Sequence, residues 1–268
     1  MNILYTVFQS IIQGLTEFLP VSSSGHLVIF QQFLKIKQPN LLIDLTLHSG
    51  TFVAIIIFFR KKIFDIIYGF FKKPFDLSNY ETDYVLKIIT VSIPTGIMGL
   101  LIYKFSEVFE SVFVVIIGFF LTGILLIVAE KISKKFNNYK ILPSFSQAFI
   151  IGLFQGIAVL PGFSRSGWTI SAALLVGLSA SQATEFSFIT GIVPLFFALL
   201  LEFLSIKNID LNLGFNLIVG FSVSFIVGIV AIKVLLEFIR RYKLWLFGIY
   251  LFTIAFISCI LWIITRNL

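Results

Sequence analysis

The sequence predicts an all-α protein that crosses a membrane several times, and its composition and apolar pattern lead to this fold class. Of its 268 residues, 58% are hydrophobic and only 12% are charged, and the mean hydropathy is +1.03. Soluble domains carry about 25% charged residues, so the composition excludes a soluble protein. Long apolar runs such as FVVIIGFFLTGILLIVA favour helices, since the strands of a membrane barrel would alternate every second residue.

Six stretches are long and apolar enough to cross a bilayer, whose hydrocarbon core needs about 20 helical residues. They lie at 41–59, 85–103, 112–129, 186–204, 214–236 and 244–264. Three connections are rich in Lys and Arg, around 60–73, 131–140 and 240–243. The positive-inside rule places these connections in the cytoplasm, so the net charge of +7 reflects membrane topology and does not indicate a nucleic acid partner.

Two further segments, 1–35 and 145–178, are expected to be re-entrant hairpins. Counting membrane crossings back from the basic connection at 240–243 places both ends of 145–178 inside. The same reasoning places both ends of 1–35 outside, if that segment is built in the same way. The polar turns are LPVSSSGH in the first hairpin and PGFSRSGWT in the second. Such irregular backbone is tolerated within a membrane only where protein covers it or where it lines a wet cavity.

An internal repeat relates the two hairpins. QGLTEFLPVSSSGHLVI aligns without gaps with QGIAVLPGFSRSGWTIS, at an offset of 142 residues. The matches pair Gln13 with Gln155, Gly14 with Gly156, Ser22 with Ser164, Ser24 with Ser166 and Gly25 with Gly167. Because each half has an odd number of spans, the second half is expected to be inverted relative to the first. We therefore predict two inverted repeats, 1–130 and 145–268, each a hairpin plus three transmembrane helices, joined by a cytoplasmic linker at 131–144.

The two turns are expected to meet and to form a polar site. Gln13 and Glu17, four residues apart, share one face if their segment is helical. The other polar groups of the turns are Ser22, Ser23, Ser24, His26, Ser164, Arg165, Ser166 and Thr169. Helix N-termini, hydroxyls and a forked guanidinium favour a phosphate ligand. A carboxylate at such a site can hold a divalent metal or act as a general base, and a serine near a histidine permits an activated nucleophile.

These residues also have purely structural interpretations. Glu17 and Arg165 could simply neutralise one another, the serines could cap the exit helices, and His26 could be a hydrogen-bond partner at a helix start. His48 lies within a predicted span, where an ionisable residue is a functional candidate, although a packed neutral histidine explains it equally well. Three further acidic residues are interpreted as boundary residues (Asp44 and Glu130) or as ordinary helix capping (Glu185).

The motifs QGLTEFLPVSSSGH, DLTLHSGT, LPGFSRSGWT and ATEFSFITGIVP resemble those of the undecaprenyl-diphosphate phosphatase family of bacteria, also called the bacitracin-resistance family. The resemblance runs along the whole chain. It implies hydrolysis of undecaprenyl diphosphate, which recycles the lipid carrier of cell-wall precursors and gives resistance to bacitracin. It also implies a divalent cation, Mg²⁺ or Ca²⁺, and a homodimer. The expected location is the bacterial cytoplasmic membrane, with the site opening toward the outer face.

The resemblance also assigns roles to residues. It implies that Glu17, Ser23, His26 and Arg165 are catalytic, that Glu17 and Gln13 hold the metal, and that Ser22, Ser164, Arg165, Ser166 and Thr169 bind the phosphates. One departure concerns Gln13, where many relatives have Glu. An amide can only orient a water or a metal, so the metal site should be weaker or should be completed by substrate oxygens.

Two questions stay open from the sequence. Ser23 could form a covalent phosphoryl intermediate, or Glu17 could activate water directly; we slightly favour Ser23. The alternative function is a transporter of polyprenyl phosphate, because inverted repeats with broken helices are common in transporters. Glu17 with His26 favours hydrolysis, since pure anion binding needs no carboxylate at the site.

Overall fold

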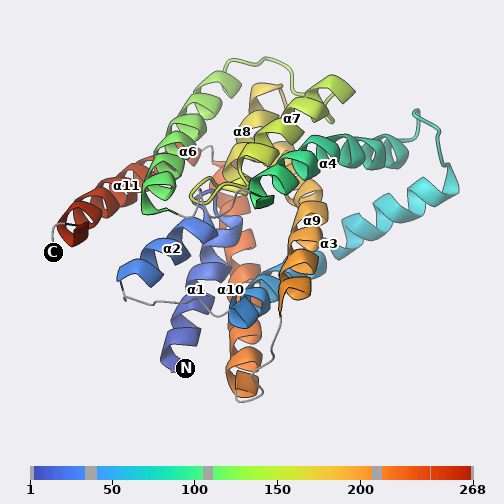
Figure 1. Ribbon diagram of the computed structural model, residues 1–268. Helices are drawn as coiled ribbons and strands as arrows, with labels where there is room; N and C mark the ends of the chain where they lie inside the picture. The colour runs from blue at the N-terminus through green and yellow to red at the C-terminus, as the bar shows by residue number, and fades with distance from the viewer. Residues whose placement is uncertain (1–2, 34–40, 105–110, 207–212, 242, 267–268) are drawn as a thin grey trace.

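The computed structural model describes residues 3–33, 41–104, 111–206, 213–241 and 243–266, and these parts of the chain fold into helices joined by turns (Figure 1). Six of the described helices are long and apolar enough to span a membrane. They are α3 (Leu41–Lys72), α4 (Tyr80–Lys104), α6 (Val112–Ser133), α9 (Ala180–Ser205), α10 (Gly214–Arg240) and α11 (Leu244–Arg266). Each contains one of the six predicted spans, which confirms an all-α polytopic membrane protein.

The two predicted hairpin segments each form a pair of short helices. The first pair is α1 (Ile3–Phe18) and α2 (Ser23–Phe33), and the second is α7 (Phe145–Ile157) and α8 (Arg165–Leu175). Both α2 and α8 have 11 residues, so each is about 16 Å long, roughly half of the ~30 Å hydrocarbon core. Neither exit helix can cross a bilayer. Their re-entrant placement, and the inverted orientation of the two halves, stay predictions.

One predicted helix end is wrong. The basic segment 60–73 was expected to be a connection, but α3 continues through it to Lys72 and has 32 residues. Arg and Lys are good helix formers, and no proline occurs until Pro74, which disfavours helical backbone just before it. The helix is therefore about 48 Å long, and its last turns lie with the start of α4 at one edge of the molecule (Figure 1).

The interpretation of Glu185 as a capping residue is also wrong. The N-cap of α9 is Ser179, which forms a capping box with Gln182. Glu185 instead pairs with Lys62 of α3, with Nζ and Oε1 3.3 Å apart. The helical extension of α3 brings this lysine to α9, so the basic residues of the predicted connection also join two helices.

Glu130 is more than a boundary residue. Its side chain is buried near the end of α6, where Oε2 accepts a hydrogen bond from the backbone N–H of Trp245 at 2.8 Å. Its other carboxylate oxygen accepts from Lys134 Nζ at 2.5 Å. A carboxylate at the N-terminal turn of α11 stabilises the positive end of that helix. Glu130 therefore fixes α11 against α6, and the two helices pack along one another (Figure 1).

The entering helix of each hairpin packs against the second long helix of the other half. Helix α1 lies on α10, and α7 lies on α4. Small residues allow these close contacts: a Cβ at Gly228 of α10 would lie 2.9 Å from Phe18 of α1. Gly118 of α6 contacts the second turn in the same way, because a Cβ there would lie 2.5 Å from the carbonyl carbon of Gly162. Gly118 and Gly228 thus serve helix packing within one chain.

The second turn rests on α6 through backbone contacts and one hydroxyl. Gly162 has φ +86°, and a Cβ at this position would lie 2.5 Å from Val115 Cα. The hydroxyl of Thr122 accepts hydrogen bonds from the backbone N–H of Ser164 at 3.3 Å and from Trp168 Nε1 at 2.9 Å. These contacts fix the start of α8, and with it the polar residues that follow.

A pair of alanine substitutions separates backbone strain from this close packing. Gly177 also has a positive φ, +98°, but its Cβ position meets only the Lys140 side chain, at 3.9 Å. Gly177→Ala is expected to cost about 1–2 kcal/mol of folding free energy, the price of left-handed backbone. Gly162→Ala should cost clearly more, because α6 must also move. Thermal unfolding in detergent measures both, and an equal loss in the two variants would show that the turn is not tightly seated on α6.

Candidate active site

The two turns share one local hydrogen-bond pattern. Ser22 Oγ accepts from the backbone N–H of Gly25 at 3.3 Å, and Ser164 Oγ accepts from Gly167 N–H at 3.1 Å. Each serine also lies close to the serine two residues later, at 3.3 Å in the first turn and 3.2 Å in the second. Ser22 and Ser164 therefore cap the exit helices. The positive ends of α2 and α8 begin directly at the two turns.

Ser22 has a strained backbone, with φ +69°. A non-glycine residue in this region costs about 1–3 kcal/mol, and such strain persists where the surrounding structure enforces it, often at functional sites. Here the Ser22 carbonyl accepts from both the backbone N–H and the ring Nδ1 of His26, at 3.3 and 2.7 Å. The strained conformation thus fixes the path of the first turn into α2.

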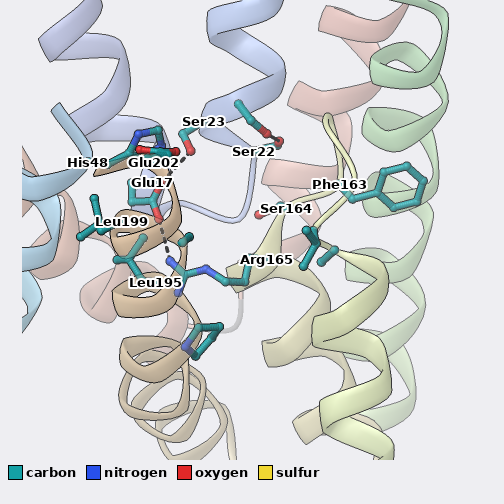
Figure 2. Close-up of a pocket in the computed structure, with 15 residues that line it drawn as sticks. Glu17, Ser22, Ser23, His48, Phe163, Ser164, Arg165, Leu195, Leu199 and Glu202 are labelled. Atoms are coloured by element: carbon teal, nitrogen blue, oxygen red, sulfur yellow. Dashed lines mark hydrogen bonds and ion pairs between the residues drawn. The ribbon is translucent and has the colours of Figure 1, made fainter. Parts of the chain in front are cut away.

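Glu17, at the end of α1, is the centre of the polar contacts between the turns. Its Oε1 accepts from Arg165 Nη2 at 2.6 Å. Its Oε2 accepts from Ser23 Oγ at 2.6 Å and from Gln13 Nε2 at 3.1 Å. The Glu17 side chain is 7% exposed, and Figure 2 shows it directed at Arg165 across the gap between the two hairpins. The structure therefore brings the carboxylate of one half and the guanidinium of the other into direct contact.

The guanidinium of Arg165 is also held by α9. Its Nη1 donates to the carbonyl oxygen of Gly191 at 2.7 Å, and a Cβ at Gly191 would lie 2.6 Å from that nitrogen. Only glycine allows this approach. The turns are further joined by Ser166, whose hydroxyl donates to the Leu19 carbonyl at 3.2 Å. Arg165 is thus fixed from two sides, although its side chain remains 22% exposed.

A pocket of about 190 Å³ lies at this junction. Its polar lining comes from the first turn with α1, the second turn, α3 and α9, and consists of Glu17, Ser22, Ser23, Ser24, Ser164, Arg165, His48 and Glu202 (Figure 2). His48, left open from the sequence, is therefore a lining residue, with its Nδ1 bonded to the Asp44 carbonyl at 2.9 Å. Six of these eight residues lie in the two predicted turns and the helix that enters the first.

Some predicted site residues do not line this pocket. The His26 ring points toward α6 and α11, where its Nε2 lies 2.8 Å from the Tyr250 hydroxyl and its ring stacks on that tyrosine. Thr169 is fully buried between α7 and α8, donating to the Arg165 carbonyl at 2.7 Å and to Gln155 Oε1 at 3.3 Å. Ser166 faces Leu19 instead of the pocket. These three side chains support the turns in this conformation.

The donor set determines which metal ion the site can hold. Gln13, a predicted metal ligand, is fully buried beside Glu17 and does not line the pocket, and its Oε1 has no hydrogen-bond partner in the described part of the chain. The described residues contain no group of three or more His, Cys, Asp and Glu side chains able to hold a metal by themselves. Mg²⁺ is commonly bound by one or two carboxylates plus phosphate oxygens and water. The residues therefore fit an oxygen-bound cation whose shell a phosphate ligand completes.

The sequence reasoning missed three residues of the site. Glu202 was detectable, because an acidic residue within the apolar stretch ALLLEFL is a functional candidate. Gly191 and Tyr250 gave no signal, since each matters only through a contact with a residue more than 20 positions away. The assembled arrangement combines a guanidinium, two helix N-termini, hydroxyls and the carboxylates of Glu17 and Glu202, which together can bind a phosphate and assist phosphoryl transfer.

Comparison with known proteins agrees with this chemistry. The family model for bacitracin resistance protein BacA matches residues 6–257. A protein of Halothermothrix orenii is 38% identical over 265 residues, which are 97% of this chain and 98% of that protein. One of Buchnera aphidicola is 38% identical over 262 residues (95% and 96%), and one of Methanococcus maripaludis is 36% identical over 247 residues (92% and 95%). All three are named undecaprenyl-diphosphatase.

The buried ion pair can be tested by its effect on stability. Arg165→Gln leaves a buried carboxylate without its cation and is expected to cost about 3–5 kcal/mol of folding free energy. Adding Glu17→Gln should restore part of that loss, since the double variant buries no charge at this contact. The exposed pair Glu237–Arg241, whose Nη2 and Oε1 lie 2.8 Å apart, is the matched control and should contribute at most about 1 kcal/mol. Additive losses in a double-mutant cycle followed by thermal unfolding would contradict coupling between Glu17 and Arg165.

Proposed function

This chain belongs to the bacitracin resistance protein BacA family, and on that premise we propose how its residues act on their substrate. It is an undecaprenyl-diphosphatase, a membrane enzyme that hydrolyses undecaprenyl diphosphate to undecaprenyl phosphate and inorganic phosphate. The observation that carries our placement of the reaction is the contact between Glu17 and Arg165 at a pocket formed by both turns.

The diphosphate binds at the ends of α2 and α8. Arg165 has five N–H donors, and its contacts with Glu17 and Gly191 use two of them, so three can reach phosphate oxygens. The hydroxyls of Ser22 and Ser164 line the same pocket, and the helix N-termini add a favourable field for an anion. Forked, charge-assisted hydrogen bonds of this kind hold phosphate in a fixed orientation, which is the main requirement of phosphoryl transfer.

Ser23 is the nucleophile that the geometry favours. Its O–H already donates to Glu17 Oε2 at 2.6 Å, within the range for general-base catalysis. Ser23 Oγ forms a bond to the terminal phosphorus as its proton passes to Glu17, and the bond from that phosphorus to the bridging oxygen breaks. Undecaprenyl phosphate leaves, and water then hydrolyses the phosphoserine to inorganic phosphate and serine. In the alternative route Glu17 takes the proton from water, which attacks the terminal phosphorus directly.

A divalent cation, Mg²⁺ or Ca²⁺, is part of the proposal. Glu17 and the unpartnered Oε1 of Gln13 would hold it, together with substrate oxygens. When bound, such an ion offsets the negative charge of the phosphates. Gln13 also donates to Glu17 Oε2, so it orients the carboxylate that receives the Ser23 proton. Glutamate at this position would instead place a second carboxylate against Glu17, which a bound cation would have to neutralise.

His26 acts as a positioning residue in the conformation described. Its Nδ1–H donates to the Ser22 carbonyl, so in the neutral ring Nε2 accepts a hydrogen bond from the Tyr250 hydroxyl. The ring thus ties the strained first turn to α11. Direct proton transfer by His26, which the sequence predicts, requires the ring to leave Tyr250 and rotate toward the pocket.

The orientation follows from charge. The ends of α3, α6 and α10 that carry Lys72, Lys134 and Arg240 are cytoplasmic by the positive-inside rule. Helix α9 begins on the cytoplasmic side, because both ends of the preceding segment 145–178 are predicted to lie inside. Glu202 lies near the other end of α9, so the proposed pocket opens toward the outer face of the bacterial cytoplasmic membrane. A homodimer stays a prediction from the family resemblance, and Gly118 and Gly228 do not add to it, because both make their close contacts within the chain.

Loss of the Glu17 carboxylate should abolish turnover in a folded protein. We expect Glu17→Gln and Ser23→Ala to lower the release of inorganic phosphate from undecaprenyl diphosphate by about 10²-fold or more, the usual contribution of general acid–base catalysis. Glu130→Gln is the matched control, because it removes an equally buried carboxylate outside the pocket. Full turnover by Glu17→Gln would refute the proposed site. Retained turnover by Ser23→Ala alone would select direct attack by water.

Kinetics can distinguish a His26 that positions the first turn from a His26 that transfers a proton. If His26 positions the turn through Tyr250, then His26→Ala and Tyr250→Phe should lower kcat by a similar factor, about 10-fold, and the double variant should be no slower. Each variant should also keep the wild-type pH profile of kcat. A much larger loss in His26→Ala, with a changed profile, would show direct proton transfer by the ring.

A further inference from the structure

A second, larger cavity adjoins the polar pocket. Its volume is about 680 Å³, within the range of about 300–1,000 Å³ that is typical of small-molecule sites. Most of its lining comes from α4 and α9, with Leu41 of α3 and Val159 of the second turn. Four residues line both cavities: Val159, Pro194, Ala198 and Glu202. The two cavities therefore adjoin, with most of the charged groups in the polar pocket and a larger, mostly apolar space beside it. We call this apolar space between α4 and α9 the α4–α9 groove.

The groove exists because α4 and α9 pack loosely, whereas the helices related to them by the internal repeat, α10 and α3, pack closely. Helix α10 packs closely along α3, and a Cβ at Gly50 of α3 would lie 2.6 Å from the Phe221 carbonyl oxygen. The pair related to it by the internal repeat is α4 with α9, and there α4 packs mainly on α7 and only loosely on α9. Among the described residues, a Cβ at Gly96 of α4 would meet nothing within 4 Å, and one at Gly99 only Val159, at 3.8 Å. These two glycines leave unfilled space facing the groove.

Away from Glu202, which lies where the groove meets the polar pocket, the walls of the groove are mostly apolar. Ser92 and Thr95 line it, but their hydroxyls donate to the carbonyls of Ile88 and Val91, each at 2.8 Å. Leu100 and Phe197 are more than half exposed at the rim, on surface that faces lipid in a membrane-spanning bundle. A lipid can therefore enter sideways without withdrawing its chain from the bilayer.

We infer that the α4–α9 groove binds the first isoprene units of the polyprenyl chain while the diphosphate occupies the polar pocket, and that Gly96 and Gly99 set the width of the groove. The inference rests on the proposed function, since it places the tail relative to the proposed headgroup site. A ligand with an anionic head and an apolar tail matches both cavities. The methyl branches of a polyprenyl chain need a wider seam than a straight chain, and the two glycines provide it.

Leucine substitutions test the groove without disturbing the fold. Gly96→Leu and Gly99→Leu project into empty space and replace glycine with a better helix former. Because each displaced CH₂ contact weakens binding about fourfold, we expect KM for undecaprenyl diphosphate to rise about 10-fold or more in the purified full-length enzyme. Turnover of isopentenyl diphosphate, which has a single isoprene unit, should change less than twofold. Gly214→Leu, whose Cβ position is equally open but outside the groove, is the matched control and should change neither.

The outcomes on the two substrates are decisive. Equal losses on both substrates would show that the new side chains disturb the polar pocket, and unchanged kinetics on both would show that the tail lies elsewhere. Either result overturns the inference.

A second measurement does not depend on turnover. A photoreactive farnesyl diphosphate analogue, with its label on the first isoprene units, should crosslink to α4 and α9 in the Glu17→Gln variant, and competition by undecaprenyl diphosphate should remove the label. Labels confined to other helices, or competition by a phospholipid as effective as that by undecaprenyl diphosphate, would overturn the inference. Full turnover by Glu17→Gln would refute the proposed headgroup chemistry alone, because the labelled helices would still report where the tail binds.

Discussion

The buried contact between Glu17 and Arg165 is the interaction on which the rest of the structure depends. A charged side chain at membrane depth costs several kcal/mol even on lenient insertion scales, and a buried ion pair is tolerated only when its remaining hydrogen bonds are also made. Here Ser23 and Gln13 donate hydrogen bonds to the Glu17 carboxylate, and the Gly191 carbonyl accepts one from the Arg165 guanidinium. Each partner comes from a different hairpin. Satisfying this one pair therefore fixes the two turns relative to one another.

The turns themselves are stable because protein covers them. Irregular backbone is excluded from lipid, since its N–H and C=O groups would lack partners. At the second turn, α6 provides the cover, with the backbone of Val115 against Gly162 and the hydroxyl of Thr122 beneath the start of α8. The serine caps then direct both helix N-termini toward the same pocket. The site is thus rigid and polarised before a substrate arrives, which is the condition under which electrostatic catalysis is effective.

The two halves are similar in sequence, but their turns contribute different chemical groups to the site. At the offset of the internal repeat, Glu17 corresponds to Val159 and Ser23 corresponds to Arg165. One turn therefore supplies the carboxylate and the hydroxyl, and the other supplies the cation. The helix seams differ in the same way, because α3 and α10 are closely packed whereas α4 and α9 leave a groove. Val159, without charge, lies where the polar pocket meets that groove. The departures from symmetry give the pocket a polar end and an apolar end.

The sequence alone determined the helical membrane class, the six spans and the residues of both turns, because these follow from local rules of apolar length, helix spacing and turn chemistry. It also brought Glu17 and Arg165 together, through the internal repeat. Tertiary structure decided the rest. The Tyr250 contact turns His26 away from the pocket, Gln155 takes the hydroxyl of Thr169 into the core, and Gly191 binds Arg165 from α9. Each of these side chains has a direction set by a partner distant in the chain, and no local pattern encodes which distant helices will pack against one another.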